Sequence, residues 1–427
     1  MGNKLNFEGA VDWFRELKVA GAVNILQEWS LPLILGVFAG LLHANLDPHS
    51  YHAWVHMSVF GAVYLGHKIT IHFLINDVFM VTFFSVATKE ITEAMLPGGD
   101  LNPLRKAVNP ILGCIGGILG PVGCWLLCTW VLYDGHTDQS MIMGGWGIPT
   151  ATDIALVWLV ALIVFGKGHP AVNYLLLLAV ADDAIGLGII AFAYPDPSHP
   201  VRWSYTAISF AATGMAYFMK RVMKVYDWRW YMIPTAISWH GLMLAYVHPA
   251  LAGVFVIPCM PVALNDAGLY VKTHHWTPKN TLGNFEIAVK LFVDFGLFFF
   301  AYANAGVELS SVNGVTWIAL GSLIVGKTIW IAFFAWLGTK LGFPLPDGMS
   351  FRALFVAAVL AGLGLTVALF VAGEAFPDGN PYQAPAKMGA VLSGIVAPAI
   401  GIYLGRLWKL KKSDSTPQTH TAAAAAE

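Results

Sequence analysis

Long apolar runs recur along this 427-residue chain and limit it to folds that a lipid bilayer can hold. A helix needs about 20 predominantly apolar residues to cross the hydrocarbon core of a bilayer. Runs of this kind lie at 28–46, 72–96, 107–133, 150–165, 171–194, 203–222, 230–247, 248–264, 285–305, 314–340, 352–376 and 385–407. Because lipid offers no partner to a backbone amide, these spans must be helical. We therefore predict an all-α integral membrane protein with about twelve transmembrane helices.

The low charge content excludes an ordinary soluble enzyme. Charged residues make up 11% of the chain and hydrophobic residues 57%, whereas soluble domains carry about 25% charged residues. The formal net charge is −1, which gives no reason to expect a nucleic-acid partner. All four cysteines lie inside apolar runs, so we expect them to pack in the core rather than form disulfides or bind a metal. No cofactor is expected.

Basic residues are concentrated in alternate connections between the predicted spans. The even-numbered connections and the segment after the last span hold Arg105, Lys106, Lys167, Lys220, Arg221, Lys224, Arg229, Lys272, Lys279, Lys340, Arg352, Arg406, Lys409, Lys411 and Lys412. Since cytoplasmic loops carry an excess of lysine and arginine, this alternation predicts that both termini are cytoplasmic.

Charged residues interrupt the apolar sequence in residues 1–27. We therefore predict that this stretch is a cytoplasmic amphipathic segment and not a signal peptide. Residues 28–412 form the membrane domain, and residues 413–427 predict a disordered tail. Residues 63–71 alternate around a Gly-His pair and predict a short extracytoplasmic β-hairpin, with an irregular loop as the alternative.

Four ionisable residues lie too far inside apolar runs to reach a membrane surface. Asp153 follows the helix-breaking stretch PTAT, Asp182 and Asp183 are adjacent in LAVADDAIGLGIIA, and Lys327 is mid-span in IVGKTIW. Burying a charge costs several kcal/mol, so each residue needs a reason. A helix unwound before Asp153 would offer backbone carbonyls and the Thr152 hydroxyl to a hard cation. A lone buried ammonium is costly, so we expect Lys327 to pair with an aspartate.

The adjacent aspartates are expected to have different roles. Neighbouring residues on a helix point about 100° apart, so Asp182 and Asp183 cannot serve one ligand position equally. One should face an ion site, and the other should face a cationic partner. A buried carboxylate can hold a proton or a cation, and competition between the two couples their flows. The alternative is that these charges are interhelical ion pairs without a transport role.

Two stretches resemble each other in a way that points to a midplane site. The fourth predicted span contains PTATDIA and the eleventh contains AGLGLT, so each joins a helix breaker to a threonine. They lie at corresponding places in two segments, 107–194 and 314–407, which we interpret as inverted repeats. Paired broken helices in such repeats commonly surround a transport site.

The chain resembles the NhaA-type sodium/proton antiporter family. The resemblance is carried, in order, by INDVFMVTFF (75–84), GIPTATDIA (147–155), LAVADDAIGLGIIA (178–191), HPALAGV (248–254), FAYANAGVEL (300–309), VGK (325–327) and LAGLGLT (360–366). It implies a twelve-span bacterial inner-membrane transporter in which two broken helices cross at the midplane. It also implies electrogenic exchange of Na⁺ or Li⁺ for a larger number of protons. A homodimer joined through the hairpin and surrounded by membrane lipid is implied as well.

The resemblance also implies roles for individual residues. Asp183 would be the main ion-binding carboxylate, with Asp182 and Thr152 beside the Na⁺ ion. Asp182 would pair with Lys327 and change its protonation during the cycle. Asp153 would compensate the facing dipole ends of the broken helices.

The resemblance also implies a pH response, and the chain departs from the family at two places. Glu90, His248 and Asp77 correspond to positions implied in a pH response, although the stretch around Glu90 (TKEITEAM, 88–95) departs from the family pattern. For His248, helix capping or packing is an equally good reading. Asp294 is a further charge in an apolar run that the family lacks, and Lys290 lies one helical turn away from it.

Three alternatives to a cation exchanger remain at this point. The first is a cation- or proton-coupled carrier of an organic solute on the same fold. The second is an intramembrane aspartyl protease, against which the divergence of the adjacent aspartates and the unused Lys327 argue. The third is a sensor or scaffold that transports nothing.

Overall fold

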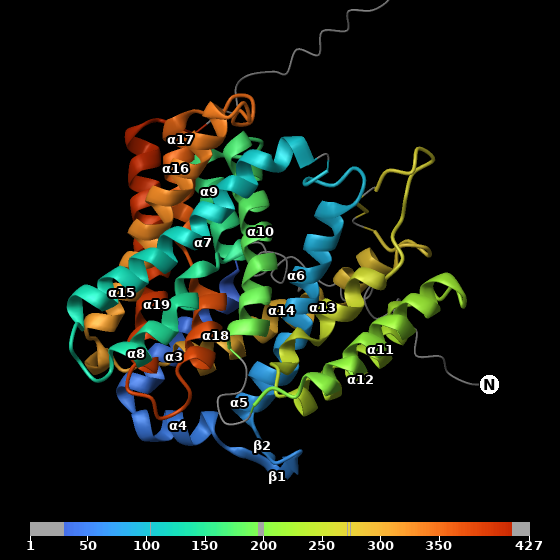
Figure 1. The fold of residues 1–427 in the computed structure, drawn as a ribbon, viewed down its shortest axis with the longest axis horizontal. Helices are drawn as coiled ribbons and strands as arrows, with labels where there is room; N and C mark the ends of the chain where they lie inside the picture. The colour runs from blue at the N-terminus through green and yellow to red at the C-terminus, as the bar shows by residue number, and fades with distance from the viewer. Residues whose placement is uncertain (1–29, 103, 195–199, 271, 274, 412–427) are drawn as a thin grey trace, which may run out of the picture.

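The computed structural model describes residues 30–102, 104–194, 200–270, 272–273 and 275–411. The described chain is almost entirely helical, with one small two-stranded sheet at one end (Figure 1). The predicted amphipathic N-terminal segment and the predicted disordered tail lie outside the described residues.

The helices follow the predicted apolar runs closely. The first half of the chain contains α3 (Leu31–Leu46), α4 (Pro48–Val55), α5 (Ile71–Phe73), η1 (Leu74–Phe79), α6 (Met80–Met95), α7 (Leu104–Leu132), α8 (Gln139–Met143), η2 (Gly144–Thr150), α9 (Ile154–Phe165), α10 (Pro170–Ala193) and α11 (Trp203–Arg221). The second half contains η3 (Trp228–Tyr231), α12 (Met232–Ala245), η4 (Pro249–Leu251), α13 (Ala252–Val256), η5 (Ile257–Cys259), α14 (Thr281–Ala305), η6 (Leu309–Ser311), α15 (Gly314–Gly321), η7 (Ser322–Gly326), α16 (Lys327–Lys340), α17 (Phe351–Ala361), α18 (Leu365–Ala375) and α19 (Gln383–Leu407).

Several of these helices are long and apolar enough to cross a membrane. In the described residues these are Ile71–Met95, Ala107–Leu132, Pro170–Ala193, Gly314–Lys340 and Gln383–Leu407. Two further pairs of helices are each bent at a short break: Gln139–Thr150 with Ile154–Phe165, at an angle of 54°, and Phe351–Ala361 with Leu365–Ala375, at 43°. If each bent pair is one span, the number of spans in the described residues rises from 5 to 7. The predicted helical membrane architecture is therefore confirmed, and the count of about twelve crossings stays a prediction.

Glycines on α7 allow two other helices to approach it closely. A Cβ on Gly120 would lie 2.5 Å from the Cβ of Trp330 on α16 and 2.6 Å from the Gly326 carbonyl oxygen. A Cβ on Gly113 would lie 2.7 Å from the Tyr174 hydroxyl on α10. Small residues at such contacts are the usual way for membrane helices to pack closely. Through them α7 holds α16 and α10, which carry the predicted lysine and aspartate pair.

The small sheet forms an antiparallel ribbon. Strand β1 (Ser58–Tyr64) pairs with β2 (His67–Thr70), with Tyr64 opposite His67. Leu65 and Gly66 at the turn have φ of 49° and 90°, the left-handed conformation that tight hairpin turns require. The ribbon begins five residues earlier than the 63–71 segment expected from the sequence. We call the end of the molecule that carries it the hairpin end.

The close packing of α7 on α16 gives a direct test. Replacing Gly120 by alanine should lower the free energy of unfolding by about 1–3 kcal/mol, because the added methyl overpacks the contact. Gly123 lies on the same helix and has nothing within 4 Å of an added Cβ, so Gly123→Ala should be neutral or stabilising. Thermal unfolding in detergent checks both variants, and an equal effect of the two would contradict this packing.

Candidate ion-binding site

The two broken helices meet where each of them loses its helical hydrogen bonds. The Asp153 amide donates to the Leu363 carbonyl oxygen at 2.8 Å, which joins the break before α9 to the break before α18. The Asp153 carboxylate accepts from the Leu156 amide at 3.1 Å and from the Thr366 amide at 3.2 Å. One side chain therefore caps the N-termini of both α9 and α18, and its negative charge lies at two positive helix-dipole ends.

Asp182 and Lys327 form a buried ion pair beside this crossing. Lys327 Nζ lies 2.9 Å from Asp182 Oδ2 and donates to the Thr152 hydroxyl at 2.7 Å. The hydroxyl proton of Thr152 can reach Asp182 Oδ2 at 2.7 Å or the Ala361 carbonyl oxygen at 3.0 Å. All three side chains are buried. The structure thus brings together residues from α10, α16 and the segment before α9 that the sequence places far apart.

Asp183 is buried next to this pair but has no counter-charge of its own. In the described chain it takes part in no ion pair within 4.0 Å, and its Oδ1 atom is buried without a hydrogen-bond partner. The Oδ1 atom of Asp182 is likewise buried and unpaired. Such orphaned acceptors are unfavourable in an apolar interior. Carboxylate and hydroxyl oxygens are the ligands that hard cations prefer, and each aspartate keeps one carboxylate oxygen without a partner.

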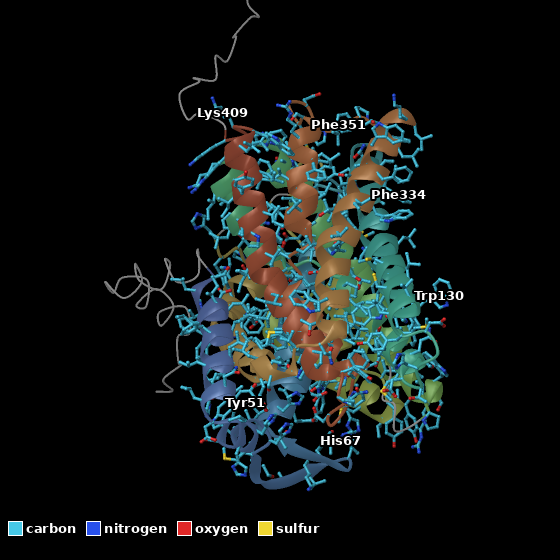
Figure 2. The ribbon with its side chains drawn as sticks, turned by 90° about the vertical axis from the view of Figure 1, so that its left-hand side faces the viewer. Tyr51, His67, Trp130, Phe334, Phe351 and Lys409 are labelled. Atoms are coloured by element: carbon cyan, nitrogen blue, oxygen red, sulfur yellow. The ribbon has the colours of Figure 1, made fainter. Side chains whose placement is uncertain are left out.

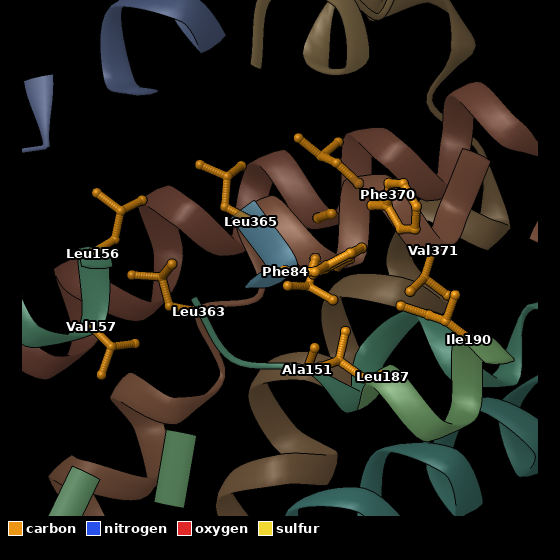
Figure 3. Packing of buried hydrophobic residues seen from close by; sticks show 14 of the residues in the cluster. Phe84, Ala151, Leu156, Val157, Leu187, Ile190, Leu363, Leu365, Phe370 and Val371 are labelled. Carbon is orange, nitrogen blue, oxygen red and sulfur yellow. The ribbon is translucent and has the colours of Figure 1, made fainter. Parts of the chain in front are cut away.

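Apolar side chains surround the crossing. A Cβ on Gly186 of α10 would lie 3.9 Å from the Cβ of Ala151 in the first break, and Figure 3 shows apolar side chains gathered around this region. Phe84 of α6 packs edge-to-face on Phe370 of α18, with ring centroids 5.2 Å apart. Asp153 and Asp182 are only 2% and 1% exposed, and electrostatic interactions are stronger in such an interior than in water.

Asp77 and His248 lie together toward the hairpin end, next to Glu374, which was not predicted from the sequence. His248 Nε2 lies 3.2 Å from Glu374 and 3.8 Å from Asp77. The other ring nitrogen, Nδ1, accepts from the Ala250 amide at 3.2 Å. The capping reading of His248 is therefore confirmed, and the same ring also faces two carboxylates. The three residues line a cavity of about 320 Å³ that also reaches His67 of the ribbon.

The opposite end of α6 carries a buried ionic cluster centred on a residue that was not predicted. Lys89 is fully buried between Glu93, 2.9 Å away, and Glu286 of α14, with which it forms a second ion pair. Glu90, the predicted residue in this stretch, forms no ion pair within 4.0 Å in the described part of the chain. A lysine in the apolar run 72–96 was the available signal for this cluster.

Asp294 lies outside the crossing. Its carboxylate is 3.5 Å from Lys290 Nζ on the same face of α14, and the two side chains are 21% and 54% exposed. The one-turn pairing expected from the sequence is thus present, at a partly exposed position.

Comparison with known proteins identifies the family. The profile of the family described as Na⁺/H⁺ antiporter 1 matches residues 25–404. The chain belongs to this family. It is 49% identical to the Na⁺/H⁺ antiporter NhaA of Geobacter metallireducens over 392 residues, covering 91% of this chain and 98% of the relative. It is 47% identical to NhaA of Desulfitobacterium hafniense strain DCB-2 over 395 residues, covering 92% and 98%.

The predicted resemblance to NhaA-type antiporters is therefore confirmed. Membership of a transporter family also confirms that the chain is not an enzyme and removes the protease alternative. A solved structure of the sodium proton antiporter MjNhaP1 from Methanocaldococcus jannaschii aligns with 96% of each chain at 14% identity and a TM-score of 0.45. That likeness is too low to bear on the fold of this protein.

The buried pair should behave as one energetic unit. Asp182→Asn or Lys327→Met alone should cost about 3–5 kcal/mol of stability, because each leaves its partner buried and unpaired. The double variant should cost at least about 1 kcal/mol less than the sum of the two. Thermal or denaturant unfolding in detergent measures this coupling.

The partly exposed pair on α14 is the matched control. Lys290→Met and Asp294→Asn should each cost little, and their coupling should be about 0.5 kcal/mol or less. Additive losses at Asp182 and Lys327 would contradict the buried pair.

Proposed function

We propose that this chain exchanges Na⁺ or Li⁺ for protons across the membrane through competition at Asp183 and Asp182. The observation that carries the proposal is the contrast between the two adjacent carboxylates. Asp182 is neutralised by Lys327 at 2.9 Å, whereas Asp183 is buried without an ion-pair partner in the described residues and has an unpaired oxygen. A carboxylate in that state must take up a proton or a cation, since a bare buried charge is too costly.

The ion site uses oxygens from two segments. Asp183 supplies the carboxylate that binds the ion first, and Asp182 and the Thr152 hydroxyl supply further oxygens. The Thr152 hydroxyl already accepts from Lys327 and can donate to Asp182, so its orientation follows the protonation of that pair. Asp153 remains occupied by two backbone amides, which suits a fixed compensating charge better than a ligand.

The Asp182–Lys327 pair explains how more than one proton could move for each cation. A cation that approaches Asp182 competes with the Lys327 ammonium for the same carboxylate, and Lys327 then becomes free to release its proton. The second proton comes from Asp183. Exchange of two protons for one monovalent cation would move net charge, which makes transport electrogenic.

The remaining expectations follow from family membership. The protein is an integral protein of a bacterial inner membrane with both termini in the cytoplasm, and the hairpin end faces outward. Access to the site alternates as the segments 107–194 and 314–407 rock against the remaining helices. Two copies associate through the ribbon of β1 and β2, surrounded by membrane lipid. The residues Asp77, His248 and Glu90 adjust activity to pH.

Removing the unpaired carboxylate should abolish exchange. In proteoliposomes with an imposed pH gradient, Na⁺ and Li⁺ but not K⁺ should collapse the gradient with the unmodified protein. Asp183→Asn should reduce the flux at least about a hundredfold, because a neutral amide cannot exchange a proton for a cation. Asp294→Asn, which removes an acid outside the crossing, should retain the flux. Sodium-dependent flux that survives in Asp183→Asn would contradict the assignment.

Competition also fixes how sodium affinity varies with pH. Below the pH at which the site binds protons, every unit decrease in pH should weaken the apparent Na⁺ affinity about tenfold per displaced proton. Two displaced protons should give a limiting slope near two on a logarithmic plot. Equilibrium Na⁺ binding at several pH values measures it, and an affinity independent of pH would contradict competition.

A further inference from the structure

A hollow at the end of the molecule opposite the ribbon combines an apolar floor with a basic rim. It has a volume of about 380 Å³ and is lined by Ile163, Val164, Ile402, Gly405, Arg406, Lys409 and Lys411. The hollow lies between the C-terminal ends of α9 and α19. Lys409 is near the end of α19, at the opposite pole from Tyr51 and His67 (Figure 2).

Close contact between the two helices creates the groove. Gly405 of α19 meets Val164 of α9 so closely that a Cβ on the glycine would lie 2.5 Å from the Val164 Cγ1 atom. Ile163 and Ile402 line the apolar floor next to this contact. Ile163 is 41% exposed, so the floor of the groove is open to the surroundings of the protein.

The turn that ends α19 places the basic residues at the rim. The Leu410 amide donates to the Gly405 carbonyl oxygen at 3.0 Å, and the Lys409 amide donates to the Arg406 carbonyl oxygen at 3.2 Å. These are the bonds of a Schellman motif, in which the residue after the helix adopts a left-handed conformation and is usually glycine. Here that residue is Lys409, with φ of 52°, a conformation that disfavours any side chain. A glycine would relax the turn but would remove one of the three rim charges.

The rim has no internal counter-charge. Arg406, Lys409 and Lys411 are exposed, and none of them forms an ion pair within 4.0 Å in the part of the chain that the structure describes. The connections at this end of α9, α17 and α19, which are 165–170, 341–350 and 406–411, contain one acid, Asp347, and Lys167 adds another positive charge. An anion is therefore the complementary ligand.

We propose that this groove binds an anionic phospholipid, with the phosphate headgroup at the basic rim and the upper acyl chains on the apolar floor. Basic pockets at the membrane surface between transmembrane helices are suited to such headgroups. A soluble anion would use only the rim and would leave Ile163 and Ile402 exposed to water. A neutral lipid would use only the floor.

The rim charges have a competing explanation that predicts a different result. Lysine and arginine are favoured at helix C-termini and in cytoplasmic loops wherever these occur. On that explanation, any three exposed basic residues on this side would contribute equally to lipid binding. Lys224, Lys272 and Lys279 are exposed basic residues in other connections with the same predicted orientation, so they provide a matched comparison.

The test measures lipid binding to the purified, delipidated full-length protein. Phosphatidylglycerol and phosphatidylcholine are titrated in detergent, with native mass spectrometry for bound lipid and thermal unfolding for stabilisation. We expect phosphatidylglycerol to bind and raise the unfolding midpoint. The variant Arg406→Gln/Lys409→Gln/Lys411→Gln should bind it at least about tenfold more weakly, and Lys224→Gln/Lys272→Gln/Lys279→Gln should bind it nearly as well as the unmodified protein. Equal losses in both triple variants would overturn the proposal.

Two further arms separate binding from structure and lipid from free phosphate. Lys409→Gly should raise the unfolding midpoint of the lipid-free protein, because the left-handed turn is relaxed, and should still weaken phosphatidylglycerol binding. Unchanged lipid binding in Lys409→Gly would contradict the role of this side chain. Glycerol 3-phosphate at the same concentration should not stabilise the protein. Stabilisation equal to that from phosphatidylglycerol would identify a phosphate site and overturn the lipid proposal.

Discussion

The buried contact between Lys327 and Asp182 is the interaction on which the rest of the site depends. Neither charge is tolerable alone in an apolar interior, and together they need excellent geometry and further hydrogen bonds to be retained. The Thr152 hydroxyl supplies such a bond to each partner. Because Asp182 and Asp183 are adjacent on α10, fixing the first toward α16 turns the second away from the Lys327 ammonium. The unpaired state of Asp183 is therefore a consequence of the pair. The position of Lys327 in turn depends on close packing against α7. A Cβ added to Gly117 of α7 would lie 3.6 Å from the Lys327 Cε atom and 3.2 Å from the Ile331 side chain.

The broken helices add a second electrostatic constraint. Two helix N-termini at one point would repel each other through their partial positive charges, and their free amides would be unsatisfied. The Asp153 carboxylate offsets the positive charge and also accepts hydrogen bonds from the free Leu156 and Thr366 amides. A carboxylate used in this way has little capacity left for a ligand. The three buried acids are thus in three different states: Asp153 is bound by amides, Asp182 by an ammonium, and Asp183 by neither.

The sequence was sufficient for the helices and for the two helix breaks because both depend on local patterns. Apolar runs locate the spans, and a charge inside a run is conspicuous whatever it contacts. Glu374 was not predicted because it lies in the last turn of α18, where a charge is expected to reach the surface. Only the fold brings the His248 ring to within 3.2 Å of its carboxylate. Lys89 was visible, but its partner Glu286 is 197 residues away in the sequence. Two π-helical segments have no sequence signature. Segment η1 contains Asp77, and segment η7 ends immediately before Lys327. Such segments often occur at functional sites, and here they shift the register of both residues.

The departures from the family pattern favour an unchanged transport site over a new substrate. They motivated the solute-carrier alternative, because unfamiliar charges in the second and ninth predicted spans could have served an organic ligand. In the structure those charges are compensated locally: Lys89 is paired with Glu93 and Glu286, and Asp294 with Lys290. None of these residues contributes to the contacts that join Asp153, Thr152, Asp182 and Lys327 at the crossing. A change of substrate requires a change in the groups that face it, and those groups lie in the stretches that carry the resemblance to the family. The departures are therefore better explained as exchanges of one ionic contact for another outside the crossing.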